Sequence, residues 1–351
     1  MVVDDSVVVR RLLSRILSDD PALEVTDVAM NGRVALQKTA ELNPDVITLD
    51  VDMPELDGLA TLTELRRSWP TIPVIMFSAL TEDTAATTLE ALALGASDYV
   101  AKPSNTLDLT DAETRIRHEL IPKIKAVAEK AAPRLERVLK TRKAAAMAPN
   151  AGQIELVVIG VSTGGPQALT EILSRLPADF AAPIVIAQHM PPLFTRYLAE
   201  RLSARSPIRF QEGVTGQVLR PGEGWVAPGD FHLIFRREGP NVVLSLNQDP
   251  PENSCRPAAD PMFRSAASIC GSRVLGIVLT GMGHDGLRGC QDIKAAGGQV
   301  IAQDFASSVV WGMPGFVVNA GLADSVLPVG SIADEMVRRT GRRSPVPSDR
   351  I

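Results

Sequence analysis

The sequence predicts two α/β domains, each built on a parallel sheet with helices on both faces. Three observations support this fold class: the length of 351 residues, the apolar fraction of 45%, and the alternation of short β-branched runs with amphipathic stretches. Single domains usually contain about 100–200 residues, so this length suits two cores. The strands of parallel sheets end at one edge, where polar loop residues gather. We therefore expect functional side chains at such edges.

The first domain is expected over residues 1–125. Its strand-like runs are VVD, EVTDVA, DVITLD, PVIMFS and SDYVAK, and amphipathic stretches separate them. Five such repeats are typical of a flavodoxin-like (βα)5 fold. The first run is short because it begins at Met1. Whether so short a run forms a strand is a question for the structure.

A linker and a second domain are expected to follow. Residues 126–152 are rich in Ala, Lys, Arg and Glu and predict a helical tail that passes into a linker. Over residues 153–345, the runs IELVVIG, PIVIAQ, VLGIVLTG and QVIAQ predict a doubly wound, mostly parallel sheet. Two further runs, FHLIFRR and NVVLSL, predict an antiparallel hairpin inserted into this domain.

Composition excludes several classes of protein. The net charge is −5, which argues against a surface that binds nucleic acid or an anionic membrane. No apolar stretch of about 18 residues predicts a membrane span, and acids stand where a signal peptide carries bases. The cysteines Cys255, Cys270 and Cys290 form no CxxC pair, so neither a disulfide framework nor a zinc site is expected. We expect a cytoplasmic protein that is not inserted in a membrane.

Acidic residues mark the edge of the first predicted sheet. Asp4 and Asp5 follow the first strand, and Asp50 ends the third. Clustered carboxylates suit Mg²⁺, and Ser78 and Lys102 would bring a hydroxyl and an ammonium to the same edge. Such a group could hold a phosphoryl group on an Asp carboxylate. The alternative for any single acid is a helix cap.

The motifs VDDS, LDVDMPELDG, FSA and YVAKP resemble the receiver domain of two-component response regulators over about the first 105 residues. The resemblance implies that Asp50 is the phosphoacceptor. It also implies that Asp5 and Asp50 bind Mg²⁺ with Asp4 in support, that Lys102 contacts the phosphoryl group and that Ser78 responds to it.

Two further positions of this domain carry implications. Tyr99 resembles the family's aromatic switch residue, although a tyrosine packed on the sheet edge is an equal alternative. Pro103 resembles the family's cis-proline after the lysine.

A serine at a sharp turn marks the second domain. The segment GVSTGGP lies between a predicted strand and a helix, and it places Ser162 beside the helix N-terminus. Unpaired amides there would favour an oxyanion. A turn that binds phosphate, or that only reverses the chain, remains the alternative for this motif alone.

A serine nucleophile needs a base and a carboxylate. Of the four histidines, His189 ends the strand PIVIAQH and shares the edge of Ser162, whereas His118 and His232 are expected to be solvated or structural. Asp285 follows another strand in LTGMGHDG, and the adjacent His284 is expected to point elsewhere. The order Ser, His, Asp differs from that of α/β-hydrolases.

These motifs, with WVAPGDFHL, SCRPAADPMFRSAA and WGMPG, resemble the catalytic domain of chemotaxis protein-glutamate methylesterases, the CheB family, over residues 154–328. The resemblance implies that Ser162 is the nucleophile, His189 the base and then the acid, and Asp285 the orienting carboxylate. It also makes the Met282 amide an oxyanion donor, and Thr163 part of the site lining. The chemistry is acyl transfer and needs no cofactor.

The resemblance further implies the biological setting. The substrate would be glutamyl methyl esters of methyl-accepting chemotaxis receptors, with deamidation of receptor glutamines as a second activity. A chemotaxis histidine kinase would donate the phosphoryl group that controls access to the serine. Within the SCRP segment, Arg256 either meets the receptor or forms a structural salt bridge. Cys255 has no histidine-rich context in sequence and is expected to be a small packed residue rather than a nucleophile.

Overall fold

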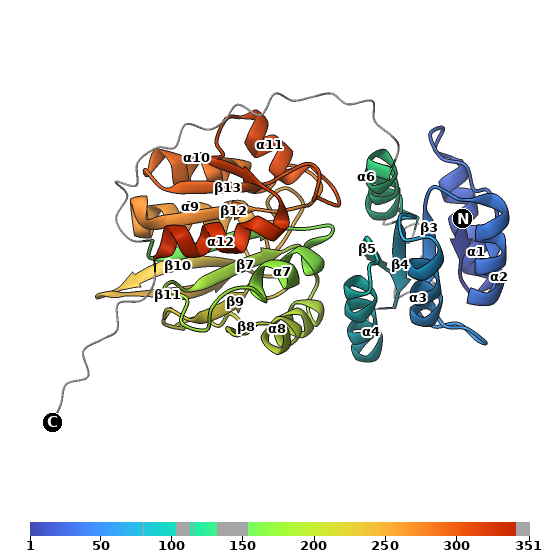
Figure 1. Cartoon of the computed structure of the whole chain (residues 1–351), viewed down its shortest axis with the longest axis horizontal. Helices are drawn as coiled ribbons and strands as arrows, with labels where there is room; N and C mark the ends of the chain where they lie inside the picture. The colour runs from blue at the N-terminus through green and yellow to red at the C-terminus, as the bar shows by residue number, and fades with distance from the viewer. Residues whose placement is uncertain (80, 103–112, 115, 132–153, 342–351) are drawn as a thin grey trace. The chain divides into compact units, whose positions relative to one another are not determined.

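The computed structural model describes residues 1–79, 81–102, 113–114, 116–131 and 154–341. The chain divides into two compact units, residues 1–139 and 140–351 (Figure 1). The boundaries 1–125, 126–152 and 153–345 stay predictions, since most of the linker region and the last ten residues lie outside the described ranges. Pro103 also lies outside them.

The first unit contains a parallel five-stranded sheet in the order β2-β1-β3-β4-β5. This is the predicted flavodoxin-like arrangement. Its strands are β1 (Val2–Val3), β2 (Val28–Ala29), β3 (Ile47–Asp50), β4 (Val74–Ser78) and β5 (Asp98–Ala101). Its helices are α1 (Val7–Ser18), α2 (Gly32–Leu42), α3 (Gly58–Ser68), α4 (Glu82–Ala93) and α6 (Ile121–Ala131), the last of which follows a π-helical turn (Ile116–Leu120).

The short strand β1 does form. Val2 and Val3 are 1% exposed, and the strand pairs with β2 on one side and β3 on the other. Its position in the middle of the sheet compensates for its length, because both edges are hydrogen-bonded and both side chains are buried. The helices start at polar caps: Ser6, Asn31 and Asp57 each accept a hydrogen bond from an amide of the first turn.

The second unit contains a parallel seven-stranded sheet in the order β14-β13-β12-β6-β7-β9-β8. Its strands are β6 (Leu156–Val161), β7 (Ile184–Gln188), β8 (Arg209–Glu212), β9 (Glu223–Val226), β12 (Val274–Val278), β13 (Gln299–Gln303) and β14 (Ser325–Leu327). The predicted hairpin is confirmed as a separate two-stranded sheet of β10 (His232–Glu238) and β11 (Asn241–Asn247).

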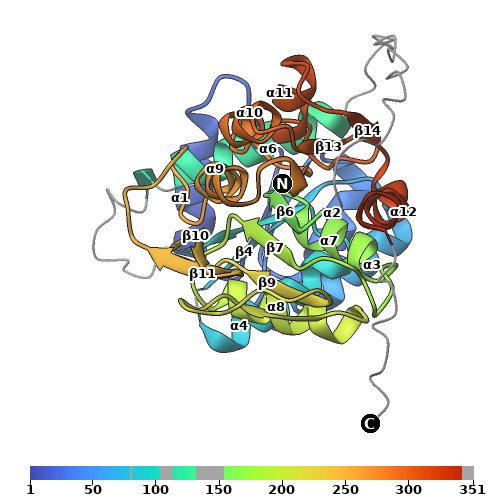
Figure 2. The ribbon, with the colours of Figure 1, turned by 90° about the vertical axis from the view of Figure 1, so that its left-hand side faces the viewer.

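Helices cover both faces of this sheet, as the doubly wound prediction requires. They are α7 (Gly165–Leu173), α8 (Phe194–Arg205), α9 (Ala259–Cys270), α10 (Leu287–Ala295), α11 (Met313–Asn319) and α12 (Val329–Thr340), and a 3₁₀ turn (Gly271–Arg273) follows α9. Figure 2 shows α9 and α10 on one side of β6 and β7, with α7 and α12 on the other. The apolar strands are buried on both faces.

The strand order of the second sheet reverses beside β6. The chain proceeds from β6 to β7 on one side, and it later adds β12 on the other side. Open α/β sheets commonly bind ligands at the carboxyl ends of their strands beside such a reversal. Within the described ranges, no helix combines the length and apolarity needed to span a membrane.

Candidate active site and acidic pocket

Three carboxylates meet at the carboxyl edge of the first sheet. One ligand oxygen from each of Asp4, Asp5 and Asp50 lies within 4.8 Å of the others. Asp4 and Asp50 are buried and Asp5 is exposed. Asp4 Oδ2 is buried, and the Lys102 ammonium lies 2.9 Å from it. Clustered carboxylate oxygens suit a hard divalent cation.

Lys102 partly neutralises the negative charge of this acidic pocket. Its Nζ lies 2.7 Å from Asp50 Oδ2 and 2.9 Å from Asp4 Oδ2. Burial raises the pKa of Asp50 to about 6, and the charge of Asp4 adds to this rise while Lys102 opposes it. At neutral pH, Asp50 is therefore mostly ionised.

Ser78 and Tyr99 lie on the neighbouring strands. Ser78 ends β4, is 1% exposed, and donates from Oγ to the carbonyl of Ala79. Tyr99 lies on β5 and is buried, which raises its pKa well above the usual value; the carboxylates of Asp98 and Glu119 raise it further. The structure thus gives Tyr99 an inward position packed in the unit.

Ser162 follows β6 in a turn fixed by backbone hydrogen bonds. Its amide donates to the carbonyl of Thr280, and its carbonyl accepts from Gly165 at the start of α7. Gly164 has φ +78°, and a Cβ there would also lie 2.5 Å from Val309 Cγ2, so glycine is required. Ser162 is half-buried, and across the described part of the chain its Oγ makes no hydrogen bond. The hydroxyl is therefore available to a substrate.

The loop after β12 comes close to Ser162. A Cβ on Gly281 would lie 2.7 Å from Ser162 Cβ, so this position also needs glycine. The next residue, Met282, is half-buried, and no described residue accepts a hydrogen bond from its amide. Thr163 is 2% exposed, and its carbonyl accepts from Thr280 Oγ1. Met282 therefore follows directly on a residue that lies against Ser162, and backbone amides in such positions can stabilise an oxyanion.

Strand pairing places His189 next to Ser162. In the β6–β7 register Val161 is opposite Gln188, and the His189 amide donates to the Val161 carbonyl. His189 Nε2 lies 2.7 Å from Asp285 Oδ2. Residues from the ends of three adjacent strands, β7, β6 and β12, therefore converge at one edge.

Asp285 is held by donors from several directions. Oδ2 accepts from His189 and from the Ala259 amide at 2.6 Å, whereas Oδ1 accepts from the Asp260 amide at 3.0 Å and from Asn253 Nδ2 at 2.9 Å. Ala259 and Asp260 begin α9, so Asp285 caps a helix from another part of the chain. Burial alone would raise the pKa of Asp285, but His189 and these amides hold it below its usual value.

Cys255 contacts the other nitrogen of the imidazole. Its Sγ lies 3.4 Å from His189 Nδ1. The pair is separated by 66 residues in sequence, so no histidine lies near Cys255 along the chain, and only folding of the 252–255 turn brings the two side chains together. Burial lowers the pKa of His189, but the charges of Cys255 and Asp285 outweigh burial and raise it to about 10. Sequence spacing contained no signal for this contact.

The remaining sequence candidates lie apart from this cluster. His118 is exposed, and His232 is buried with Nε2 3.2 Å from the carbonyl of Pro250. His284 is exposed and packs edge-on against Phe316. Arg256 pairs with Asp230 at 2.6 Å and donates to two backbone carbonyls, of Gln248 and Asp249, which is the structural alternative for this residue.

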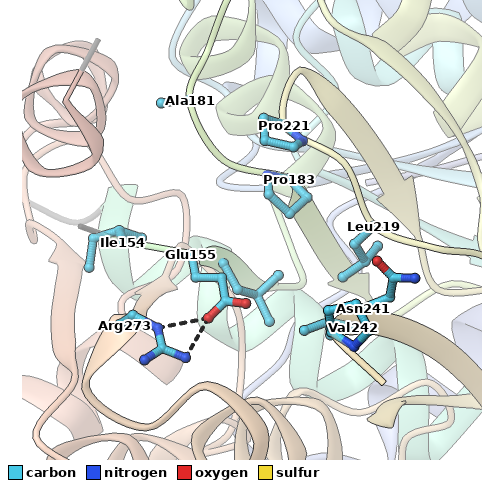
Figure 3. Close-up of a pocket in the computed structure, with 11 residues that line it drawn as sticks. Ile154, Glu155, Ala181, Pro183, Leu219, Pro221, Asn241, Val242 and Arg273 are labelled. Carbon is cyan, nitrogen blue, oxygen red and sulfur yellow. Dashed lines mark hydrogen bonds and ion pairs between the residues drawn. The ribbon is translucent and has the colours of Figure 1, made fainter. Parts of the chain in front are cut away.

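A separate hollow lies at the opposite edge of the second sheet (Figure 3). Glu155, Pro183 and Arg273, which immediately precede β6, β7 and β12, line it, and Arg273 pairs with Glu155. Ser162 follows the carboxyl end of β6, so the sheet separates this hollow from the serine. We assign it no part in the chemistry at Ser162.

Comparison with known proteins identifies the family. Residues 157–336 match the CheB methylesterase family and residues 1–113 match the response regulator receiver domain. A protein-glutamate methylesterase/protein-glutamine glutaminase of Trichodesmium erythraeum is 50% identical over 97% of this chain and 98% of its own length. The similarly named protein of Pyrococcus abyssi is 41% identical over 96% and 92%. The crystal structure of the Thermotoga maritima CheB methylesterase catalytic domain is 43% identical, with a TM-score of 0.52 over 53% of this chain and 99% of that domain. The chain therefore belongs to the CheB methylesterase family and carries an N-terminal response regulator receiver domain.

Proposed function

We propose that this chain hydrolyses glutamyl methyl esters of methyl-accepting chemotaxis receptors, with Ser162 as nucleophile, His189 as base and Asp285 as its orienting carboxylate. One observation carries the proposal. The hydrogen-bonded His189–Asp285 pair lies at the strand end next to Ser162, whose hydroxyl makes no hydrogen bond with any residue that the structure describes. The activities for which the two relatives are named, methylesterase and glutaminase, supply the substrate class.

The ring nitrogen that takes the serine proton follows from the contacts. Because Nε2 of His189 is bound to Asp285, Nδ1 is left to accept the proton from Ser162 Oγ. Cys255 Sγ contacts Nδ1 in this structure, so the hydroxyl must replace the thiol before attack. His189 must also be neutral to act as a base, and its raised pKa opposes this at neutral pH.

The reaction then proceeds by acyl transfer. Ser162 Oγ attacks the ester carbonyl, and the oxyanion forms beside the free amide of Met282 and the N-terminus of α7. His189 returns the proton to the methoxide oxygen, and methanol leaves. Water, deprotonated by His189, hydrolyses the acyl-enzyme. With a glutamine side chain, ammonia would leave instead, which is the glutaminase activity.

The receiver unit is proposed to control this reaction through phosphorylation of Asp50 by a chemotaxis histidine kinase. Asp5 and Asp50, with Asp4 in support, would bind Mg²⁺, and the cluster of their carboxylate oxygens fits that role. The cation would offset the charge of the phosphoryl group. Lys102 would contact the added phosphate, and Ser78 and Tyr99 would report its presence. Free cysteines support a cytoplasmic location.

Methanol release tests both parts of the proposal. Methylated receptors are incubated with the full chain, with and without a small-molecule phosphodonor. The proposal expects release that depends on Ser162 and that the phosphodonor increases. Absence of release under both conditions would refute the assignment.

A further inference from the structure

We propose that Asn253 is a positioning residue of the active site, which bridges the buried carboxylates of Asp260 and Asp285 and so keeps Asp285 directed at His189. The inference rests on the proposed function, because it assigns a supporting residue to the same Ser162 chemistry. Asn253 lies far from Ser162 in sequence, and no motif of the serine site contains it.

Asn253 lies in a tight turn between β11 and α9. Glu252 and Cys255 close the turn through a backbone hydrogen bond of 2.9 Å. Asn253 and Ser254, at the centre, both have left-handed backbone, with φ of 52° and 62°. Asparagine tolerates this region better than most residues, and a left-handed non-glycine pair requires support from its surroundings. The turn therefore holds the Asn253 amide in a fixed direction.

The Asn253 side chain uses both of its donor hydrogens on carboxylates. Nδ2 lies 2.9 Å from Asp260 Oδ2 and 2.9 Å from Asp285 Oδ1. Asp260 is 0% exposed and Asp285 is 1% exposed, so water does not screen them. In the described part of the chain, Asn253 is the one side chain that donates to both carboxylates.

The two carboxylates form a reciprocal pair of helix caps. Asp285 accepts from the first amides of α9, whereas Asp260 lies in α9 and accepts at 2.7 Å from the Gly289 amide of α10. This arrangement fixes both helices, but it also brings two buried negative charges together. Burial raises the pKa of Asp260, and the charge of Asp285 raises it further, while the Gly289 amide and Asn253 oppose the rise.

Loss of the Asn253 donor would let the two carboxylates share a proton. A shared proton weakens the charge that Asp285 presents to His189, which lowers the pKa of His189, so the acid limb of the rate would move to lower pH than in the wild type. The other ionisable groups that face this pair or its partners do not bridge it. They are His189 after β7, Cys255 and Glu252 in the turn, Arg264 in α9, and Cys290, Asp292 and Lys294 in α10.

The test is the pH dependence of kcat/KM for methanol release from methylated receptors by the full chain. Asn253→Gly removes the side chain and suits the left-handed backbone, whereas Asn253→Ala removes it and strains that backbone. We expect both variants to lose about ten- to hundredfold in kcat/KM at neutral pH, as for loss of a charged hydrogen bond. We also expect both acid limbs to move to lower pH.

A matched control lies in the same turn. Ser254 has the same left-handed backbone and an exposed side chain, so Ser254→Gly should keep the wild-type pH profile. Adding Asp260→Asn to Asn253→Gly removes the second charge and should move the acid limb back toward the wild-type position. Thermal unfolding identifies any loss of folded protein.

An unchanged profile in Asn253→Gly, or a uniform loss of rate without movement of the acid limb, would overturn the inference. Either result would leave the proposed function intact. If Ser162→Ala retained turnover, the proposed function itself would fail, so the two failures are distinguishable.

Discussion

The acidic pocket of the first unit and the serine site of the second use the same architectural position with different electrostatics. Both lie at the carboxyl edge of a parallel sheet, where the strand order reverses. In the pocket, burial and a second acid raise the pKa of Asp50, and a lysine provides the only direct positive charge among the described residues there. In the serine site, backbone amides and a histidine lower the pKa of Asp285.

The difference shows that the hydrogen-bond donors around a buried carboxylate, more than its degree of burial, determine its pKa and its function. Asp50 pairs with a lysine and lies beside two other carboxylates, an arrangement that suits a metal ion and a phosphoryl group. Asp285 has almost no free acceptor capacity, since five donors engage its two oxygens. That saturation keeps it ionised and fixed beside His189.

Replacement of the serine should have the largest effect on the second site. We expect Ser162→Ala to lower kcat for methanol release by about 10⁴-fold or more, as for other serine nucleophiles. The assay is methanol release from methylated receptors. Ser174→Ala, at the exposed far end of α7, is the control and should retain wild-type turnover. Substantial turnover by the Ser162 variant would remove the reason to treat this edge as the reactive one.

The corresponding change in the first site should affect regulation only. Asp50→Asn removes the phosphoacceptor, so the full increase in turnover given by a phosphodonor should disappear while basal release persists. Asp52→Asn changes an exposed carboxylate two residues away and should keep the increase. A normal response of the Asp50 variant would mean that another group receives the phosphoryl group.

Mg²⁺ binding by the carboxylates of the acidic pocket should depend on pH. Because the pKa of Asp50 is about 6, Mg²⁺ competes with a proton below that pH. Affinity should be nearly constant above pH 7 and should fall about tenfold per pH unit below pH 6. Calorimetric titration with Mg²⁺ measures this. Affinity that did not change between pH 7 and pH 5 would show that Asp50 is not a ligand.

The smallest expected effect concerns Cys255, which contacts Nδ1 of His189 while Asp285 contacts Nε2. Cys255 is the main group that raises the pKa of His189, so Cys255→Ala should lower that pKa and move the acid limb of kcat/KM to lower pH. A larger neutral fraction of the base should increase turnover several-fold at pH 7. Cys270→Ala, in the same unit, is the control. Movement of the limb to higher pH would contradict the assignment of Nδ1 as the base nitrogen.

The two sites also differ in how well sequence reasoning describes them. The pocket is predictable because each of its groups ends a strand in a short motif, and strand pairing alone brings Asp4, Asp50 and Lys102 together. The same logic places Ser162, His189 and Asp285 at one edge. It does not find the contacts of Asn253 and Cys255, since these depend on how the 252–255 turn packs against loops far away in sequence.

The elements of the fold divide in the same way into those that local sequence predicts and those that depend on distant contacts. Strands β6, β7, β12 and β13 are long apolar runs, and their presence is predictable from composition. The first strand is only two residues long, and its stability comes from pairing on both sides, which local sequence does not encode. Likewise, the start of α9 has no cap of its own and takes Asp285 from another loop.

Comparison of Ser162→Ala, His189→Gln and the double variant tests most directly whether these residues act as one catalytic unit. If they do, each single change removes nearly all of the rate enhancement, and the double variant has about the same kcat as either single variant. If the losses instead multiply in the double variant, Ser162 and His189 contribute independently, and the shared mechanism proposed for this edge is contradicted.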